Sequence, residues 1–240
     1  MTLRILGVIP ARYQSKRFPG KILFKIKGKP LIQWVYEGAR RSRLIDRLII
    51  ATDDERIAEC AEDFGAEVFM SRSRHKCGSE RVAEAAGKFK YPLVVNIQGD
   101  EYSIRPEIIR AAVNAVKSST KTWAGTVAFP LKNTDDIKNP DLVKVIVDKD
   151  KNALYFSRCT IPHNAENKTG RTQYLGHIGV YAFRNKYLQK FAGLKQMPLE
   201  KAEKLEQLRI LEHGGKIVVA ITKIKTLSIN RRTDIRTLKK

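Results

Sequence analysis

The sequence is poor in the features that mark disulfide-stapled and membrane proteins. Its three cysteines, Cys60, Cys77 and Cys159, lie far apart and form no CxxC pair. This spacing argues against a disulfide framework and against a zinc site of paired cysteines. No stretch approaches the roughly 20 apolar residues of a membrane span, and the apolar run near the start is too short for a secretory signal. We therefore expect a cytoplasmic protein with reduced thiols and no membrane insertion.

Acidic residues are also scarce. The chain has 25 aspartates and glutamates against 46 lysines and arginines, which gives a formal net charge of +21. The basic residues are scattered, and no recognition-helix, RRM or KH signature accompanies them. A nucleic acid, an anionic substrate and a membrane surface are three explanations of such a charge. The absence of a basic run favours a solvated lysine-rich surface, and we expect no nucleic-acid partner.

What is present is the pattern of a large α/β protein, which we interpret as one domain over residues 1–240. Leu93 to Ile97 is a short apolar run typical of a strand buried on both faces. It leads directly into Gln98, Gly99, Asp100 and Glu101. Ligands of open α/β sheets bind beyond the carboxyl ends of strands. Gln98 is placed to read the edge of a base or sugar, and Asp100 to hold Mg²⁺. A plain polar turn is the alternative.

A second strand end carries positive charge. Ile5 to Pro10 reads as the first strand, and a basic loop with a Pro-Gly turn follows. The loop is neither a GxxxxGK[ST] nor a GxGxxG motif. Its four cations suit a triphosphate, because backbone N–H groups and basic side chains both attract anions; they are Arg12, Lys16, Arg17 and Lys21. A flexible basic loop without a ligand is the alternative.

Further elements follow from apolar spacing and turn residues. We expect parallel-type strands at 47–51 and 67–70, an antiparallel hairpin from 143–148 and 153–158, and a helix over 202–213. Asp53 is expected to cap the helix that follows it rather than to contact a ligand. Gly78, Ser79 and Arg81 begin another helix, where they are placed to meet a base or phosphate. His75 has no metal partners nearby in sequence, which favours a surface role.

Eight collinear blocks together resemble the 3-deoxy-manno-octulosonate (KDO) cytidylyltransferases, or CMP-KDO synthetases. They are IPARYQSKRFPGK (9–21), ATDDERIAE (51–59), GSERVAE (78–84), NIQGDE (96–101), VKVIVD (143–148), ALYFSRCTIP (153–162), LGHIGVYAF (175–183) and LEKAEKLEQLRILEHG (199–214). The resemblance spans nearly the whole chain. It implies the reaction CTP + KDO → CMP-KDO + pyrophosphate with Mg²⁺, for lipopolysaccharide or capsule synthesis.

The resemblance also implies a fold and a partner. The fold is a Rossmann-like nucleotide-diphosphosugar transferase fold, α/β, with a mostly parallel mixed sheet. An antiparallel extension at about 130–185 makes the contact of a homodimer. The anomeric hydroxyl of the sugar attacks the α-phosphorus of CTP in line, so the protein supplies positioning and charge neutralisation and no covalent nucleophile.

The site residues implied by the resemblance fall into four sets. The nucleotide set is Ala11, Arg12, Lys16, Arg17, Lys21, Gly78, Ser79, Arg81 and Gln98; the catalytic set is Arg12, Lys21 and Asp100; the sugar set is Gln98, Arg158, His177, Tyr181, Glu206 and Gln207; the metal set is Asp100 and Asn230. Arg158 suits the sugar carboxylate through a two-pronged pairing. A hydrogen-bonded core histidine is the alternative for His177, and a solvated helix face is the alternative for Glu206 and Gln207.

One position departs from the family pattern. Asn230 stands where the resemblance leads us to expect the second Mg²⁺-binding aspartate, and Arg231 and Arg232 follow it. An amide oxygen binds Mg²⁺ without supplying negative charge. The departure leaves three hypotheses beside plain KDO activation: a different sugar or small acid as acceptor, such as an amino-substituted or nine-carbon keto acid, or a homologue with impaired catalysis, or one that only binds CTP.

Overall fold

The computed structural model describes residues 3–15, 17–72, 75–165 and 172–239. The chain forms two compact units. Residues 1–110 and 226–240 make the first unit, and residues 111–225 make the second. The nucleotide and metal sets fall in the first unit, and the sugar set, apart from Gln98, falls in the second.

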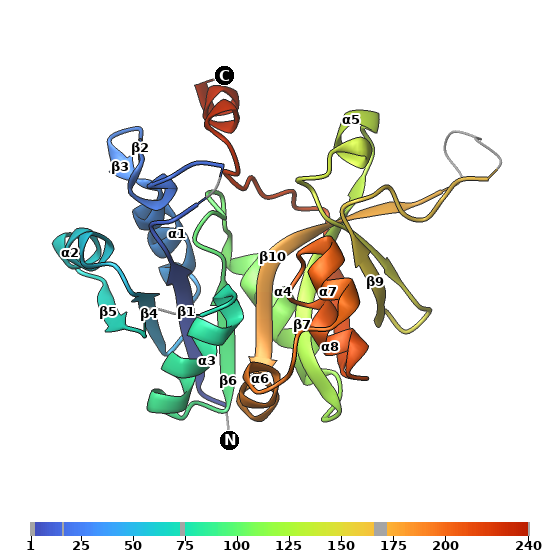
Figure 1. Ribbon diagram of the computed structural model, residues 1–240, viewed down its shortest axis with the longest axis horizontal. Helices are drawn as coiled ribbons and strands as arrows, with labels where there is room; N and C mark the ends of the chain where they lie inside the picture. Colours follow the sequence, from blue (N-terminus) through green and yellow to red (C-terminus); the bar gives the residue numbers. More distant parts are fainter. Residues whose placement is uncertain (1–2, 16, 73–74, 166–171, 240) are drawn as a thin grey trace. The chain divides into compact units, whose positions relative to one another are not determined.

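The first unit is built on four parallel strands in the order β5-β4-β1-β6 (Figure 1). Their bounds are β1 (Ile5–Ala11), β4 (Arg47–Thr52), β5 (Glu67–Met70) and β6 (Leu93–Ile97). Every residue of β1 and β6 is buried. This is the environment that their largely apolar runs predict, because strands covered on both faces have no polar side.

The helices of this unit bury one face each, as their apolar spacing requires. They are α1 (Leu31–Arg40), α2 (Glu55–Asp63), α3 (Gly78–Phe89), the start of α4 (Pro106–Lys117), and the 3-10 helices η1 (Lys21–Leu23) and η2 (Arg232–Lys239); the short strands β2 (Lys25–Ile26) and β3 (Lys29–Pro30) pair as a hairpin. The N-cap of α2 is Asp54, whose side chain accepts a hydrogen bond from the Arg56 N–H at 3.1 Å. The expectation that Asp53 caps this helix is therefore wrong.

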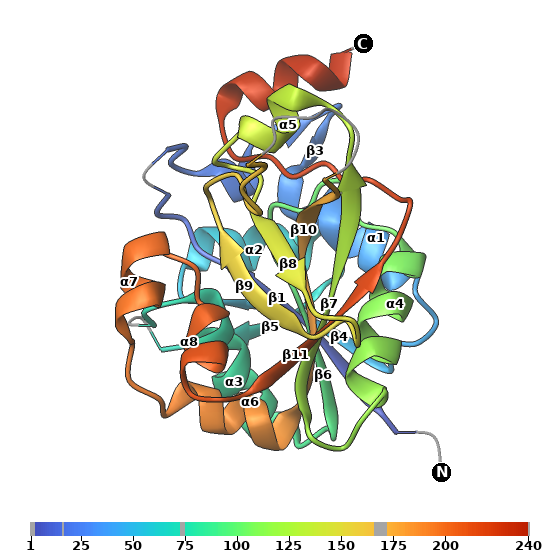
Figure 2. The ribbon, with the colours of Figure 1, turned by 90° about the vertical axis from the view of Figure 1, so that its right-hand side faces the viewer.

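The second unit has a mixed set of strands. They are β7 (Thr122–Leu131), β8 (Lys144–Val147), β9 (Ala153–Ser157), β10 (Tyr174–Arg184) and β11 (Lys216–Ile221). β11 is parallel to β7, whereas β7–β10, β10–β8 and β8–β9 are antiparallel. The hairpin β8–β9, in yellow in Figure 2, confirms the expected antiparallel extension.

The helices of the second unit are α5 (Thr134–Lys138), α6 (Asn185–Ala192), α7 (Pro198–Glu203) and α8 (Leu208–Glu212), together with the rest of α4. Gly125 of β7 lets α4 pack closely, because a Cβ there would lie 2.3 Å from the Ala112 carbonyl oxygen. The single helix expected over 202–213 is wrong. Helix α7 ends at Glu203, because the next residue, Lys204, adopts a left-handed conformation with φ of 53°.

Within the described ranges, we find no helix of the length and apolar character that crossing a membrane requires.

Candidate active site

A small cavity lies in the first unit, where β1 ends and α3 begins. Its volume is about 90 Å³. It is lined by Pro10, Ala11, Arg12, His75, Cys77, Gly78, Arg81 and Gln98. Five of these eight belong to the nucleotide set expected from the sequence. The cavity is smaller than the roughly 300 Å³ at the lower end of small-molecule pockets, so it suits one part of a nucleotide.

Gly78 lines this cavity beside Gln98. A Cβ at this position would lie 3.5 Å from Pro10 Cγ and 3.6 Å from both polar atoms of the Gln98 side-chain amide. The glycine backbone therefore approaches the Gln98 amide closely, with no side chain between them. Gly99 is more tightly confined, since a Cβ there would lie 3.1 Å from the Pro10 carbonyl oxygen. The strand ends of β1 and β6 are thus drawn together at the cavity.

Arg81 is fixed on the cavity wall by partners from two other segments. Its side chain is 7% exposed and forms an ion pair with Asp53 at 3.0 Å. It also donates a hydrogen bond to the Ser71 hydroxyl. These contacts hold the guanidinium in one orientation before any ligand arrives. Asp53 thus acts on the site through Arg81. The two residues are far apart in the sequence, so no local pattern predicts that they pair.

His75 also belongs to this wall. Its Nε2 lies 2.7 Å from Glu84 Oε2, and the side chain is 14% exposed. The surface role expected for His75 is therefore wrong. Cys77, the residue before α3, lines the same cavity. No cysteine lies near it in the sequence, so the sequence alone does not predict a role for its thiol.

Ser79 lies in a different environment from its neighbour Gly78. It is buried, and its hydroxyl accepts a hydrogen bond from Asn96 Nδ2 at 3.0 Å. This bond ties the first turn of α3 to the end of β6. Ser79 is thus placed to hold the helix start that carries Gly78 and Arg81.

Lys21 and Asp100 form a close ion pair. Lys21 Nζ lies 2.6 Å from Asp100 Oδ2, with the two side chains 10% and 27% exposed. The chain reaches Lys21 through Gly20, whose φ of 67° is readily adopted only by glycine, and Gly20 N–H donates to the Tyr13 carbonyl at 3.1 Å. Two of the three residues of the catalytic set therefore touch each other. Lys16, which the sequence places in the same loop, lies outside the described residues.

The segment that carries Asn230 runs beside Asp100. The Ile229 N–H donates to the Asp100 carbonyl oxygen at 2.9 Å. Arg17 donates to Asn230 Oδ1 at 3.3 Å. Asn230 and Asp100, the expected metal set, are therefore brought to the same place by the backbone.

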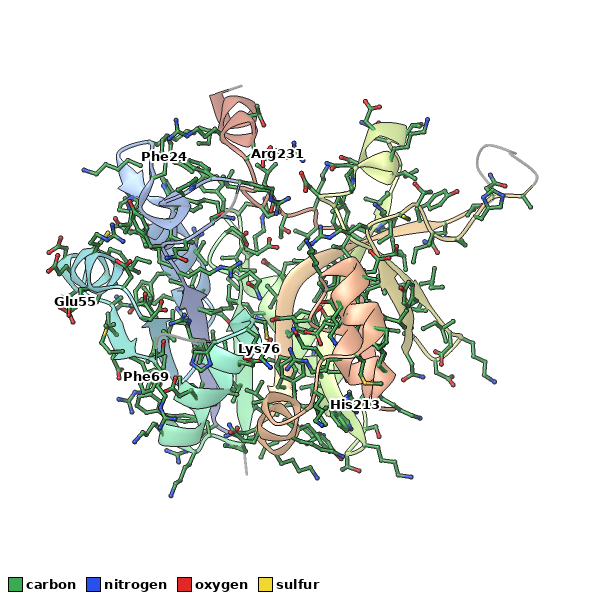
Figure 3. The ribbon with its side chains drawn as sticks, viewed as in Figure 1. Phe24, Glu55, Phe69, Lys76, His213 and Arg231 are labelled. Carbon is green, nitrogen blue, oxygen red and sulfur yellow. The ribbon has the colours of Figure 1, made fainter. Side chains whose placement is uncertain are left out.

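Asp234 caps the backbone just before it. Its Oδ2 accepts hydrogen bonds from the N–H groups of Asn230 and Arg231, at 2.7 and 2.8 Å, at the start of η2. Arg231 and Phe24, both labelled in Figure 3, lie at the same end of the first unit. Arg232 lies over the Phe18 ring, with 5.2 Å between the guanidinium carbon and the ring centroid. The loop after β1 and the C-terminal segment together make this end strongly basic.

In the second unit, Arg158 is held by a network of backbone and side-chain contacts. Its Nε donates to the Glu203 carbonyl oxygen at 2.9 Å, and its Nη1 donates to the Pro140 carbonyl oxygen at 3.1 Å. The Arg158 N–H donates to Glu203 Oε2 at 3.0 Å. Buried Lys144 donates from Nζ to the carbonyl oxygens of Asn139, Leu142 and Arg158, at 2.9, 2.9 and 2.6 Å. Burial lowers the pKa of Lys144.

Strand register relates Arg158 to His177. Lys144 on β8 is paired with Ser157 on β9 and with Gly176 on β10. The residues that follow, Arg158 and His177, therefore lie at one level, two strand spacings or about 10 Å apart. Two residues of the expected sugar set are thus placed at the same end of the second unit.

His177 and Tyr181 lie side by side in an aromatic cluster. Their ring centroids are 5.2 Å apart, and His177 is also 5.2 Å from Phe156. Removal from water lowers the pKa of His177 to about 3. It raises the pKa of the Tyr181 hydroxyl, and the charge of Glu206 raises it further. His177 is therefore neutral, and Tyr181 keeps its proton at neutral pH.

Glu206 and Gln207 occupy the break between α7 and α8 rather than a solvated helix face. Gln207 is 6% exposed and directly precedes α8, and Glu206 is half-buried. Arg209, one turn further on, is fully buried and forms a two-pronged pair with Glu200 at 2.7 and 2.8 Å. The pair fixes the segment on which the two candidate sugar ligands lie.

Comparison with known proteins places this geometry in a family. The cytidylyltransferase family model matches residues 6–220. The 3-deoxy-manno-octulosonate cytidylyltransferase of Syntrophobacter fumaroxidans is 44% identical over 236 residues, covering 97% of this chain and 94% of the relative. The enzyme of that name from Syntrophotalea carbinolica is 44% identical over 240 residues, covering 97% of this chain and 96% of the relative.

A solved structure supports the same assignment. It is a CMP:2-keto-3-deoxy-manno-octonic acid synthetase complexed with CTP, with a TM-score of 0.90 and 33% identity, covering 98% of this chain and 97% of the other. The expected nucleotide-diphosphosugar transferase fold, with a mostly parallel mixed sheet and an antiparallel extension, is confirmed. The chain belongs to the cytidylyltransferase family and, within it, to the 3-deoxy-manno-octulosonate cytidylyltransferases.

Proposed function

We propose that this chain transfers CMP from CTP to the anomeric hydroxyl of KDO and releases pyrophosphate. The observation that carries the proposal is the near full-length match, at 44% identity, to relatives named for this reaction. The cavity at the ends of β1 and β6 supports it independently, because residues expected from sequence to bind the nucleotide line it together.

The first unit binds CTP. The cavity accepts one part of the nucleotide, with the Gln98 amide as its hydrogen-bonding group and Arg81 held on its wall by Asp53. Arg12 and Lys21 bind the triphosphate, because charge-assisted hydrogen bonds from arginine and lysine to phosphate are strong. Arg17 adds a further exposed cation near this end of the unit.

The second unit binds the acid sugar. Arg158 pairs with the carboxylate, and its fixed guanidinium loses little conformational freedom on binding. His177, Tyr181, Glu206 and Gln207 contact sugar hydroxyls. Gln98, in the first unit, is a candidate for both the nucleotide set and the sugar set.

The residues beside Asp100 fit Mg²⁺ only when the substrate supplies most of the oxygens. Among the described residues no group of three aspartate, glutamate, histidine or cysteine side chains is arranged to hold a metal. Mg²⁺ is commonly held by one or two carboxylates together with substrate phosphates and water. Asp100 and the amide oxygen of Asn230 would hold the ion. When bound, Mg²⁺ neutralises charge on the triphosphate.

The chain's own residues then position the reacting groups. The sugar's anomeric hydroxyl loses its proton to water as its oxygen forms a bond to the α-phosphorus. The bond from that phosphorus to the bridging oxygen breaks, and pyrophosphate departs with Arg12 and Lys21 on its oxygens. No covalent intermediate with the protein is required. The rate depends on alignment and on positive charge placed before the reaction begins.

The setting of the reaction follows from the same assignment. We place the reaction in the cytoplasm, in a homodimer formed through the extension that contains β8 and β9. The product, CMP-KDO, supplies lipopolysaccharide or capsule synthesis.

The test is pyrophosphate release from four nucleoside triphosphates, each offered with KDO, an amino-substituted octulosonate and a nonulosonate. We expect release with CTP and KDO. If CTP releases pyrophosphate only with one of the other two acids, that acid and not KDO is the substrate. Binding of CTP without release from any acid, rescued by Asn230→Asp, would identify a homologue that has lost catalysis at this position.

A further inference from the structure

Two polar atoms of the aromatic cluster in the second unit have no hydrogen-bond partner in the part of the chain that the structure describes. One is the hydroxyl of Tyr181, which is buried, with the residue only 3% exposed. The other is Nδ1 of His177, whose ring lies beside that of Tyr181. Buried polar groups are nearly always hydrogen-bonded in folded proteins. The Tyr181 hydroxyl therefore lacks a partner that a ligand would supply. The ring of half-buried His177 lies beside that of Tyr181, with Nδ1 open to the same ligand.

Thr126 determines which nitrogen of His177 carries the proton. The Thr126 hydroxyl oxygen lies 2.9 Å from His177 Nε2 and 2.8 Å from the Val180 carbonyl oxygen. A carbonyl oxygen only accepts, and a threonine hydroxyl has one hydrogen to donate. If Thr126 donated to His177 instead, two oxygen atoms would face each other at 2.8 Å with no hydrogen between them. Thr126 therefore donates to Val180 and accepts from the His177 Nε2–H.

A bulge in β10 produces this arrangement. Ile178 is paired with Val127 of β7, but the next paired residue, Tyr181, faces Thr126. Gly179 and Val180 are extra residues on one strand, as in other bulges that redirect a chain at a functional site. The bulge brings the Val180 carbonyl oxygen to Thr126 and leaves His177 and Tyr181 with neighbouring rings. The sequence shows only a glycine within a strand at this point.

The two unpartnered atoms have complementary character. With its proton on Nε2, neutral His177 presents Nδ1 as an acceptor. Tyr181 keeps its proton, because burial and the charge of Glu206 raise its pKa, and it presents a donor. A single hydroxyl group can donate to one of these atoms and accept from the other. A carboxylate, which only accepts, cannot satisfy Nδ1.

We propose that Thr126 is a positioning residue that fixes His177 as the Nε2–H tautomer, so that Nδ1 accepts a hydrogen bond from a hydroxyl of the acid sugar. The proposal rests on the proposed function, since it names the atoms that select a hydroxyl at the sugar site. Thr126 belongs to none of the residue sets that the sequence suggested. It acts through His177 and does not itself contact the sugar.

The first readout is the tautomer, observed by ¹⁵N NMR of the full chain labelled at histidine. The chain has four histidines, and the His177 signal is assigned by its loss in His177→Gln. We expect protonated Nε2 and unprotonated Nδ1 in the native chain. A native chain with the proton on Nδ1 would overturn the proposal. Because this measurement uses the native chain, it does not depend on whether a Thr126 variant folds.

The second readout uses matched variants. Thr126→Val keeps the shape and removes the hydroxyl, whereas Thr126→Ser keeps the hydroxyl. We expect Thr126→Val to lose the fixed tautomer and to raise KM for the acid sugar about tenfold, the size of one lost neutral hydrogen bond, with the affinity for CTP unchanged. Thr126→Ser should behave as the native chain. An unchanged tautomer and unchanged KM in Thr126→Val would contradict the proposal.

The two readouts separate this inference from the proposed function. The expected tautomer in a chain that turns over no acid sugar would count against the proposed function while supporting the assignment of Thr126. Turnover of KDO by a chain whose His177 Nδ1 is protonated would support the proposed function and contradict the assignment of Thr126.

Discussion

The ion pair between Glu200 and Arg209 allows a quantitative prediction about the segment that carries Glu206 and Gln207. Arg209 is fully buried, and its guanidinium makes two hydrogen bonds to the Glu200 carboxylate, at 2.7 and 2.8 Å. The guanidinium also lies over the Phe191 ring, 4.4 Å from its centroid. Glu200→Gln removes the negative charge, keeps the shape, and leaves the buried arginine charge without this carboxylate.

Removing one partner of a buried pair costs about 3–5 kcal/mol, because the remaining charge has lost both its water and its partner. A domain has a total stability of about 5–15 kcal/mol, so Glu200→Gln should remove a large part of it. Replacing both residues, as in Glu200→Gln with Arg209→Met, removes the buried charge as well. We expect the double variant to recover most of the loss, since well-packed apolar replacements of buried pairs are often neutral.

The assay is equilibrium unfolding in urea followed by tryptophan fluorescence. The chain has two tryptophans, Trp34 in the first unit and Trp123 in the second. In a Trp34→Phe background, buried Trp123 alone reports the unit that contains the ion pair.

Asp136→Asn is the matched control for the charge change. It breaks an exposed pair with Lys225 in the same unit, and the expected cost is at most about 1 kcal/mol. A loss below 1 kcal/mol for Glu200→Gln, or a double variant less stable than either single one, would refute the reasoning.

Three further changes have defined outcomes. Lys144→Met removes the ammonium shared by three carbonyls, so unfolding should cost about 3 kcal/mol less by the same urea assay. KM for the sugar should rise more than KM for CTP, since Arg158 loses its support. For His177, whose pKa is about 3 when folded, the unfolded chain binds a proton below about pH 6.5 that the folded chain does not. Stability should therefore fall by up to about 1.4 kcal/mol from pH 7.5 to 5.5, and His177→Gln should abolish that part of the fall. Lys21→Met removes a cation beside Asp100, and kcat in a pyrophosphate-release assay should fall about 100-fold or more.

Each of these outcomes has a result that would contradict it. Equal changes in both KM values for Lys144→Met would mean that the lysine does not act through Arg158. Parallel stability curves for the native chain and His177→Gln would mean that this ring does not resist protonation. An unchanged kcat in Lys21→Met would place the lysine outside the reacting centre.

The strands of the first unit could be predicted because each is a local pattern. Leu93 to Ile97 is apolar apart from Asn96, and the structure buries all five residues. The cavity could be predicted for a related reason. Residues at the carboxyl ends of parallel strands meet at one edge, so Ala11 and Gln98 lie together although far apart in sequence.

What the sequence did not reveal depends on partners distant along the chain. The local sequence predicts that Asp53 caps a helix, because capping is a local property. Asp54 caps that helix instead, and Asp53 pairs with Arg81. His75 looked isolated, because its partner Glu84 comes from within α3.

The break between α7 and α8 and the role of Thr126 depend on backbone conformation, which the sequence pattern does not show. Periodicity predicts a continuous helix over 202–213, and it has no means of showing that Lys204 takes a left-handed conformation. Thr126 gains its role from the bulge in β10, which only the pairing of two strands defines.

The most direct test of the central claim is ³¹P NMR of CTP incubated with Mg²⁺ and KDO carrying ¹³C at its anomeric carbon. The account predicts equal amounts of pyrophosphate and of a new phosphodiester whose phosphorus signal is split by the labelled carbon. That coupling arises only when the anomeric oxygen has bonded to the α-phosphorus. CDP with a phosphorylated sugar, or pyrophosphate with free CMP and no coupled signal, would contradict it.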